Sequence, residues 1–354
     1  MKQYPKVPRY DHPAIPNEFY DEGTLWLTEK MDGSNFRFCL YEDRFADLYP
    51  EALRATGADD GDLVFGTKRA IRGVLPAGEI DGSEVDGNLR RAIRHLRTVV
   101  DRAEIRAAHD EYGPLTFFAE NMVLHTIDYD YAERPPPPLL GFDVYAPETD
   151  PRETIPPDPY AERFEGFLSA DLVFGDDGLF SRIGLDTVSI IEQDLPASEF
   201  DPTIYEVPRS TWTDDVAEGV IVRKDSECRR TKLVTNEFNE LNRTRWGGHA
   251  SDVEGTERFV ATFCTNARVR KTVQKMIVEE GYEFSKAIIE DLYPRVVEDI
   301  WAEEWRTIME LDFEFVPREV YPLVAKRCVA VVEMMETNAR LNDAPPEDLW
   351  RDLD

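Results

Sequence analysis

The stretch TEKMDGSN, residues 28–35, decides the fold of this chain, because it joins two strand-like segments and carries a lysine between them. The segment that follows, residues 36–41, has roughly the period-two alternation of a strand. The Asp32-Gly33 step is typical of a tight turn between paired strands, so the sequence predicts a hairpin here. Lys30 then presents its ammonium group beside a fixed turn. To attack phosphorus the amine must lose a proton, which requires cationic neighbours or burial.

Lysine is scarce in this chain, with ten lysines among 41 basic residues. Arginine is too basic to act as a nucleophile, whereas the pKa of a lysine changes with its surroundings. A chain that avoids lysine and yet keeps it at Lys30 and Lys232 therefore favours a chemical role at these positions. The alternative is that Lys30 is an ordinary solvated residue beside a turn.

The chain of 354 residues is strongly acidic, with 71 acidic residues and a formal net charge of -30. This balance argues against a broad basic surface for nucleic acid but leaves room for a local cationic groove. Few lysines and many acids are typical of proteins from extreme halophiles, in which a hydrated acidic surface stays soluble when salt screens charge. We therefore expect a source in a halophilic archaeon or its virus, and an acidic mesophilic protein is the alternative.

The four cysteines are far apart and form no CxxC pair, so we expect free, buried thiols and a reducing cytoplasm. The five histidines are scattered and show no zinc-ligand spacing. No signal peptide or membrane-spanning segment is visible, and we expect a cytoplasmic protein with no membrane partner.

Charged side chains stand at the ends of two further strand-like segments. Residues 62–69 end in a basic pair that includes Arg69, and residues 114–121 deliver Glu120. Between them, the apolar spacing over residues 88–109 predicts one amphipathic helix. The alternative for Glu120 is a strand-end glutamate that only faces water.

A later pair of segments brings another glutamate and the second lysine. Residues 139–145 form a strand with Phe142, which is either a core residue or a platform for a base. Residues 217–224 begin with Glu218, and a short turn then leads to Lys232, so the sequence predicts a second hairpin.

The sequence predicts helices in five further segments, which are residues 161–170, 187–193, 259–277, 288–301 and 318–339. Beyond about residue 250 strand patterns give way to helical ones. The sequence therefore predicts an α+β fold, in which a domain of mainly antiparallel sheets with flanking helices spans residues 1–245 and an all-helical domain spans residues 246–354.

Taken in order, five segments resemble the covalent nucleotidyltransferase superfamily of ligases and capping enzymes. They are residues 30–33, 117–120, 140–145, 218–223 and 232–234. Within it, the chain is most similar to the RNA ligase 2-like family, because Ser34-Asn35 follows the glycine and residues 120–129 have that family's character. A helical C-terminal domain in place of an OB barrel is also similar to that family.

The resemblance implies a role for each matching residue. Lys30 attacks the α-phosphorus of ATP and carries AMP, and Glu120 holds the ribose. Phe142 stacks on adenine. Glu218 binds Mg²⁺ or Mn²⁺, and Lys232 contacts the α-phosphate.

Four further residues receive supporting roles from the resemblance. Arg69 fills the basic position after the first motif, and Asn35 supports the nucleotide phosphate or the RNA end. Thr28 and Glu29 border the adenine. One departure is Val234, where the fifth motif often has a second lysine.

Arg230 and Lys224 are the candidates to replace that lysine, and Asp32 stands where some RNA ligases of this type have histidine. The resemblance implies an ATP-dependent RNA ligase that joins RNA 3′-hydroxyl and 5′-phosphate ends through lysyl-AMP and an adenylated RNA 5′ end. The alternatives are a DNA ligase, a GTP-using capping-type enzyme, and a non-catalytic RNA-binding protein on the same scaffold.

Overall fold

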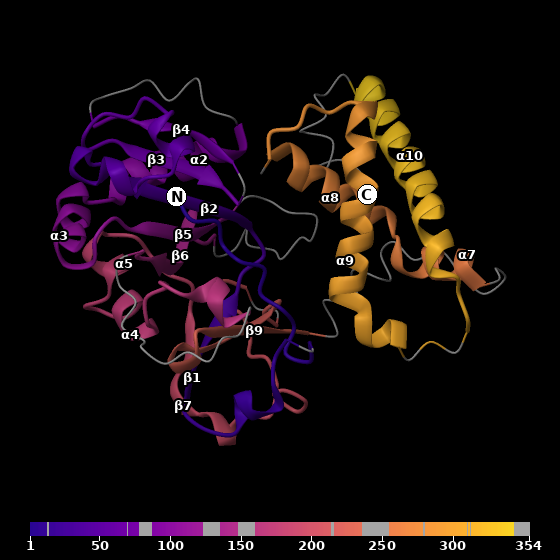
Figure 1. Ribbon diagram of the computed structural model, residues 1–354, viewed down its shortest axis with the longest axis horizontal. Helices are drawn as coiled ribbons and strands as arrows, with labels where there is room; N and C mark the ends of the chain where they lie inside the picture. Colours follow the sequence, from indigo (N-terminus) through magenta and orange to yellow (C-terminus); the bar gives the residue numbers. More distant parts are fainter. Residues whose placement is uncertain are drawn as a thin grey trace. The chain divides into compact units, whose positions relative to one another are not determined.

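The computed structural model divides into two compact units, Met1–Thr235 and Asn236–Asp354 (Figure 1). The structure describes residues 1–12, 14–68, 70–77, 87–122, 135–147, 160–213, 216–235, 255–278, 280–309, 311 and 313–342. Arg69, most of the segment 120–129 and the expected domain boundary at residue 245 lie outside these ranges, so these expectations stay predictions.

The described strands of the first unit form two antiparallel sheets. A four-stranded sheet has the order β7-β1-β8-β9, with β1 (Thr24–Lys30), β7 (Ile190–Pro196), β8 (Gly219–Lys224) and β9 (Arg229–Val234). A five-stranded sheet has the order β4-β3-β2-β5-β6, with β2 (Ser34–Leu40), β3 (Leu63–Thr67), β4 (Ile71–Leu75), β5 (Thr116–Asn121) and β6 (Leu139–Tyr145).

The turn at Asp32-Gly33 does not close a hairpin, so that expectation was wrong. β1 pairs with β7 and β8, whereas β2 pairs with β3 and β5, and the chain crosses from one sheet to the other between Lys30 and Ser34. Both are central strands whose neighbours include segments distant in the sequence, so long-range pairing overrides the local turn signal. The second predicted hairpin, formed by β8 and β9, is confirmed.

Helices cover one face of the five-stranded sheet. The α-helices described in this unit are α1 (Glu51–Arg54), α2 (Gly87–Val99), α3 (Arg102–Tyr112), α4 (Ala170–Val173) and α5 (Leu179–Arg182). The last four cover this face, whereas α1 packs with Cys39 and Val64 on the other face. Ile93 of α2 and Ile105 of α3 belong to the same apolar core as Phe36, Phe38 and Phe117 of the sheet. This core fixes the sheet from the side that carries the phenylalanines.

Three helix predictions in this unit were wrong. Residues 161–170 form only a short 3-10 helix, Ala161–Phe164, and α4 begins at their end. The single helix expected over residues 88–109 is divided, because the side chain of Asp101 accepts the N–H groups of Ala103 and Glu104 at 2.8 and 3.3 Å and caps a new helix. Residues 187–193 lead into β7, where pairing with β1 overrides the short helical pattern.

The opposite face of the five-stranded sheet meets the four-stranded sheet. Asp143 on β6 is cross-strand to Phe118, and that row faces away from the row of Phe36. Asp143 forms ion pairs with Arg223 of β8 at 3.5 Å and with Arg230 of β9 at 2.9 Å. The two sheets therefore face each other through these side chains.

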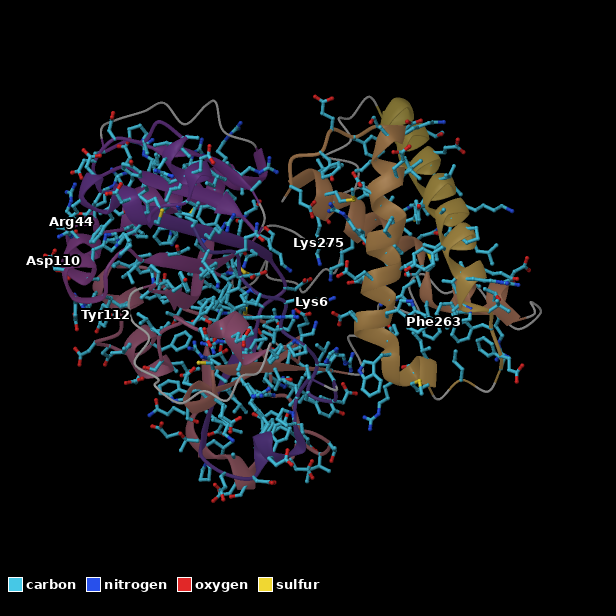
Figure 2. All side chains as sticks on the ribbon, in the orientation of Figure 1. Lys6, Arg44, Asp110, Tyr112, Phe263 and Lys275 are labelled. Atoms are coloured by element: carbon cyan, nitrogen blue, oxygen red, sulfur yellow. The ribbon has the colours of Figure 1, made fainter. Side chains whose placement is uncertain are left out.

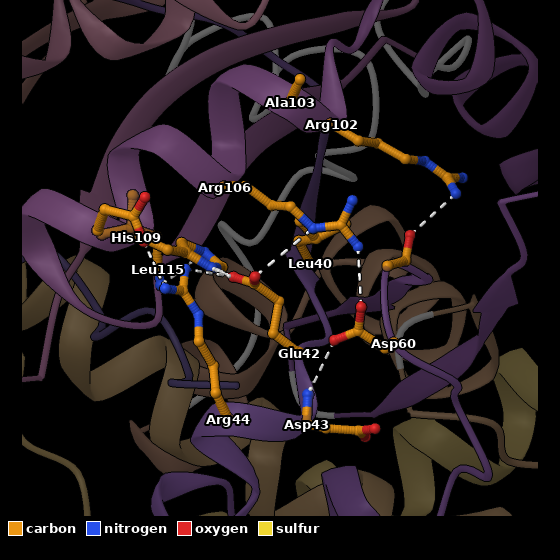
Figure 3. A network of polar contacts seen from close by, with 12 residues as sticks. Leu40, Glu42, Asp43, Arg44, Asp60, Arg102, Ala103, Arg106, His109 and Leu115 are labelled. Carbon is orange, nitrogen blue, oxygen red and sulfur yellow. Dashed lines mark hydrogen bonds and ion pairs between the residues drawn. The ribbon is translucent and has the colours of Figure 1, made fainter.

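A polar network ties α3 to the turn after β2 (Figure 3). Nδ1 of His109 lies 2.5 Å from Oε2 of Glu42, and the N–H of Leu115 donates to Nε2 of His109 at 3.2 Å. Because Nε2 accepts, the hydrogen-bond pattern assigns the proton to Nδ1. Burial lowers the pKa of His109, although Glu42 opposes this shift. Arg44 and Arg106 contact the same carboxylate at 3.2 and 3.5 Å.

The second unit is helical where it is described. Its helices are α7 (Gly255–Phe263), α8 (Asn266–Val278), α9 (Ile289–Met309) and α10 (Pro317–Asn342). Phe259, Val273, Ile300 and Val324 contribute to one buried core, and Figure 2 shows the side chains of this unit, with Phe263 and Lys275 marked. The helical pattern read from the sequence is confirmed.

The architecture is therefore α+β, with antiparallel sheets, flanking helices and a helical C-terminal region, as expected. The four cysteines are free and buried, also as expected. Within the part of the chain that the structure describes, we find no helix long and apolar enough to cross a bilayer.

Candidate active site

Lys30 ends β1 beside the start of β8. Its cross-strand partner is Gly219, which brings the side chain of Lys30 next to Glu218. Nζ of Lys30 lies 2.5 Å from Oε1 of Glu218, and the two side chains are 22% and 5% exposed. The first and fourth segments singled out in the sequence therefore meet in an ion pair.

The surroundings of Lys30 are anionic. Burial lowers the pKa of Lys30, but the charges of Glu218, Asp32 and Glu120 outweigh burial, so the pKa lies above its ordinary value. Lys30 is accordingly an ammonium ion in this arrangement. An amine in these surroundings loses its proton only when something offsets these carboxylates.

Gly33 lets the crossing between the sheets pass close to Glu120. A Cβ at Gly33 would lie 2.5 Å from Cγ of Glu120 and 2.8 Å from the carbonyl oxygen of Asn121, closer than real Cβ atoms come. Asn35 is the cross-strand partner of Glu120. Glycine is thus required by a close approach, which holds Glu120 within electrostatic reach of Lys30.

Lys232 shares a sheet face with Lys30. Ile221 pairs with both Thr28 and Lys232, and Gly219 pairs with Lys30. Residues two apart along a strand lie on one face, so Thr28 is on this face too. A strand spacing of about 4.8 Å and a rise of about 3.4 Å per residue put the Cα atoms of the two lysines about 12 Å apart. Two lysine side chains can span that distance with a phosphate between them.

A buried ionic network joins the two sheets on the same face as Lys30 and Lys232, further along the strands. Arg223 and Arg230, already paired with Asp143, also contact Oδ1 of Asp225 at 3.2 and 3.5 Å. The hydroxyl of Tyr4 donates to Asp143 at 3.0 Å. Arg230 is fully buried in this network, so it does not replace the second lysine of the fifth motif.

Lys224 does not replace that lysine either. Its Nζ donates to the carbonyl of Phe19 at 2.9 Å and pairs with Glu227 at 2.6 Å. Both candidates named from the sequence were therefore wrong, because each side chain already has a structural partner.

Arg9, which the sequence analysis did not single out, lies beside Lys232. The N–H of Lys232 donates to the carbonyl of Pro8, and the N–H of Tyr10 donates to the carbonyl of Lys232, both at 2.9 Å. This parallel bridge pairs Arg9 with Lys232, and paired residues point to the same side of a sheet. The side chain of Arg9 is 18% exposed and lies 3.8 Å from Asp11. The signal in the sequence was residues 1–10, which carry three basic residues and no acid.

The remaining expected residues lie in different surroundings. Phe142 is half-buried at an irregularity between β5 and β6, with ring centroids 4.9 Å from Tyr4 and 6.3 Å from Phe118. Glu29 points to the face of β1 opposite Lys30, and its carboxylate accepts the N–H of Thr211 at 3.3 Å. The structure brings together Lys30, Glu218 and Glu120, but not Glu29.

A family model described as RNA ligase matches residues 23–235, which is more than half of the chain. The chain belongs to the RNA ligase family. The match includes the four-stranded sheet with Lys30 and Lys232 and the five-stranded sheet with Glu120.

This RNA ligase family chain matches no curated protein by sequence. Forms of the Naegleria gruberi RNA ligase are among the solved structures similar to it. A mutant with ATP and Mn is 12% identical over 68% of this chain, with a TM-score of 0.42. The Naegleria gruberi RNA ligase with PPi is 14% identical over 69% of this chain, with a TM-score of 0.40. This chain spans 58% of the length of each.

Proposed function

We propose that this chain is an ATP-dependent RNA ligase that joins RNA 3′-hydroxyl and 5′-phosphate ends through lysyl-AMP. The observation that carries the proposal is the 2.5 Å contact of Lys30 with Glu218, at the point where the nucleotidyltransferase-like segments converge. Membership of the RNA ligase family over residues 23–235 supports it.

In the first step, the neutral amine of Lys30 attacks the α-phosphorus of ATP. An N–P bond forms, the bond to the bridging oxygen breaks, and pyrophosphate leaves. The ammonium proton must first go to solvent, and Glu218, Asp32 and Glu120 oppose its loss because they raise the pKa of Lys30. Offsetting the charge of Glu218 lowers that pKa and prepares the nucleophile.

The donor set fits a divalent cation that arrives with ATP. Glu218, Asp32 and Glu120 place carboxylate oxygens around Lys30, and oxygen ligands suit Mg²⁺ and Mn²⁺. Among the described residues no group of three or more His, Cys, Asp or Glu forms a metal cage by itself. ATP phosphates would therefore complete the coordination, with Glu218 as the protein ligand. When bound, the cation would neutralise phosphate charge and weaken the hold of Glu218 on Lys30.

Cationic side chains on the sheet face would receive the phosphates. Lys232 contacts the α-phosphate, and Arg9 beside it supplies the second positive charge that Val234 does not. Charge stabilisation of this kind accounts for most catalysis of phosphoryl transfer. The nucleoside contacts follow the family pattern, with Glu120 on the ribose and Phe142 on the adenine.

Two steps complete the reaction. An oxygen of the RNA 5′-phosphate attacks the phosphorus of lysyl-AMP, the N–P bond breaks, and the amine of Lys30 leaves with a proton from solvent. The RNA 3′-hydroxyl then loses its proton and attacks the 5′-phosphate, and AMP leaves. Asn35, cross-strand to Glu120, would support the nucleotide phosphate or contact the RNA end.

The test is covalent labelling with α-labelled ATP and a divalent metal at high salt, with Lys30→Ala as the control. We expect the native chain to carry label that survives denaturation and is released by acid. The Lys30→Ala variant should carry no label. Joining of a 5′-phosphorylated RNA to an RNA 3′-hydroxyl end should follow. Label from GTP instead of ATP would mean a capping-type enzyme. Joining of DNA ends instead of RNA ends would mean a DNA ligase, and no label after a preformed adenylate is excluded would mean a non-catalytic binder.

A further inference from the structure

The solvent face of α2 differs in charge from the rest of the chain. Acidic residues outnumber basic ones 71 to 41 overall, yet α2 has four arginines and no acid. All four arginines are exposed, and they are Arg90, Arg91, Arg94 and Arg97. A helix face that is merely solvated would follow the acidic composition of the chain, so this basic face needs a separate reason.

The arginines form a stripe that does not contribute to the core. The opposite side of α2 packs into the core of the five-stranded sheet through Leu89, Ala92, Ile93 and Leu96. At 100° per residue, Arg90, Arg94 and Arg97 fall within about 60° of arc and extend over about 10 Å of helix. This arrangement presents several guanidinium groups along one line.

Acids near the C-terminal end of α2 have other partners. The carboxylate of Asp101 accepts backbone N–H groups at the start of α3. Glu104 pairs with Arg182 at 3.7 Å. Burial lowers the pKa of Arg102, Asp62 opposes this shift, and the charges of Arg106 and Arg97 lower the pKa further. Arg97 therefore lies close enough to the arginines of α3 to act on one of them electrostatically.

We propose that Arg90, Arg94 and Arg97 hold the sugar–phosphate backbone of RNA, an inference that rests on the proposed function. Guanidinium groups bind phosphate oxygens in a fork, and a row of them matches a regularly charged strand. α2 lies on the phenylalanine face of the five-stranded sheet, opposite the face that carries Glu120. The contacted RNA must therefore extend beyond the ends that react at Lys30.

The test compares two triple variants of equal charge. One is Arg90→Gln with Arg94→Gln and Arg97→Gln, and glutamine keeps helix propensity and most of the apolar stem. The matched control replaces three exposed arginines elsewhere, and these are Arg54→Gln, Arg209→Gln and Arg318→Gln. The dissociation constants for a short and a long 5′-phosphorylated RNA are measured by fluorescence anisotropy over a range of salt.

We expect the α2 variant alone to lose the affinity that the native chain gains with the longer RNA. Three lost phosphate contacts on a single strand reduce the slope of log affinity against log salt by about 2. The idea is overturned if the α2 variant and the control behave alike, if short and long RNA lose affinity equally, or if polyglutamate competes as well as RNA. Labelling by ATP is measured separately. No label on the native chain would refute the proposed function, while the comparison of RNA affinities still decides the role of α2.

Discussion

Replacing Gly33 with alanine examines the close approach that places Glu120 beside Lys30. The new methyl group would lie 2.5 Å from Cγ of Glu120 and 2.8 Å from the carbonyl oxygen of Asn121, where ordinary contact begins at 3.4 Å. Glu120 or the crossing between the sheets must then move by roughly 1 Å. Overpacking of this kind costs about 1–3 kcal/mol of stability, and a misplacement of about 1 Å at a reacting group lowers the rate about a hundredfold.

The assay is the rate of label transfer from α-labelled ATP, measured beside chemical unfolding. We expect Gly33→Ala to be adenylated about a hundredfold more slowly at saturating ATP. Gly73→Ala is the matched control, because its Cβ would lie 2.8 Å from the ring of Phe65 on the edge strand β4. That control should lose similar stability and keep the native adenylation rate.

A second variant background, Glu120→Ala, separates the clash with the Glu120 side chain from other effects of the methyl group at residue 33. In a chain that already carries Glu120→Ala, adding Gly33→Ala should cost less further stability than it does in the native chain, because the contacts with the Glu120 side chain are gone and only the 2.8 Å contact with the Asn121 carbonyl oxygen remains. A native adenylation rate in Gly33→Ala, or an equal stability cost in both backgrounds, would refute the reasoning.

Three other outcomes follow from the structure. Arg9→Ala should raise the KM for ATP about tenfold, as expected for a lost charge-assisted hydrogen bond, and adding Val234→Lys should restore it; unchanged ATP kinetics would contradict the placement of Arg9. Arg230→Met leaves the buried carboxylate of Asp143 with weaker pairing and should lower the free energy of unfolding by about 3–5 kcal/mol in a denaturant titration, whereas a loss below about 1 kcal/mol would show that the network is dispensable. The folded-state pKa of His109 is lowered from 6.5, so its contribution to stability is present above about pH 6.5 and is lost as the pH falls through the folded-state pKa; His109→Gln should flatten this acid-side loss, and an unaltered pH profile would exclude His109 as its source.

The sequence indicated which side chains meet more reliably than it indicated the path of the chain. Lys30, Glu120 and Glu218 were selected from their positions at strand ends, and the structure places them together. The Asp32-Gly33 signal predicted a hairpin because turn residues report only local geometry. Which strands pair depends on partners up to about two hundred residues away, and no short pattern encodes them.

Residues whose surroundings depend on distant segments were harder to assign from the sequence. Two backbone hydrogen bonds pair Arg9 with Lys232, and the segment around Arg9 contains none of the motifs found in the sequence. Arg230 and Lys224 looked available for phosphate because the sequence hides their burial. Their partners, Asp143 and the carbonyl of Phe19, are distant in the chain.

The crossing at residues 31–33 has a consequence for how this chain can diverge. Three residues connect the last position of β1 to the first of β2, with Lys30 just before that link and Asn35, the cross-strand partner of Glu120, just after it. One inserted residue would shift the register of β2 relative to β5 and turn Asn35 and its neighbours to the opposite face. Related chains should therefore keep the length of this link fixed and accept insertions in surface loops elsewhere.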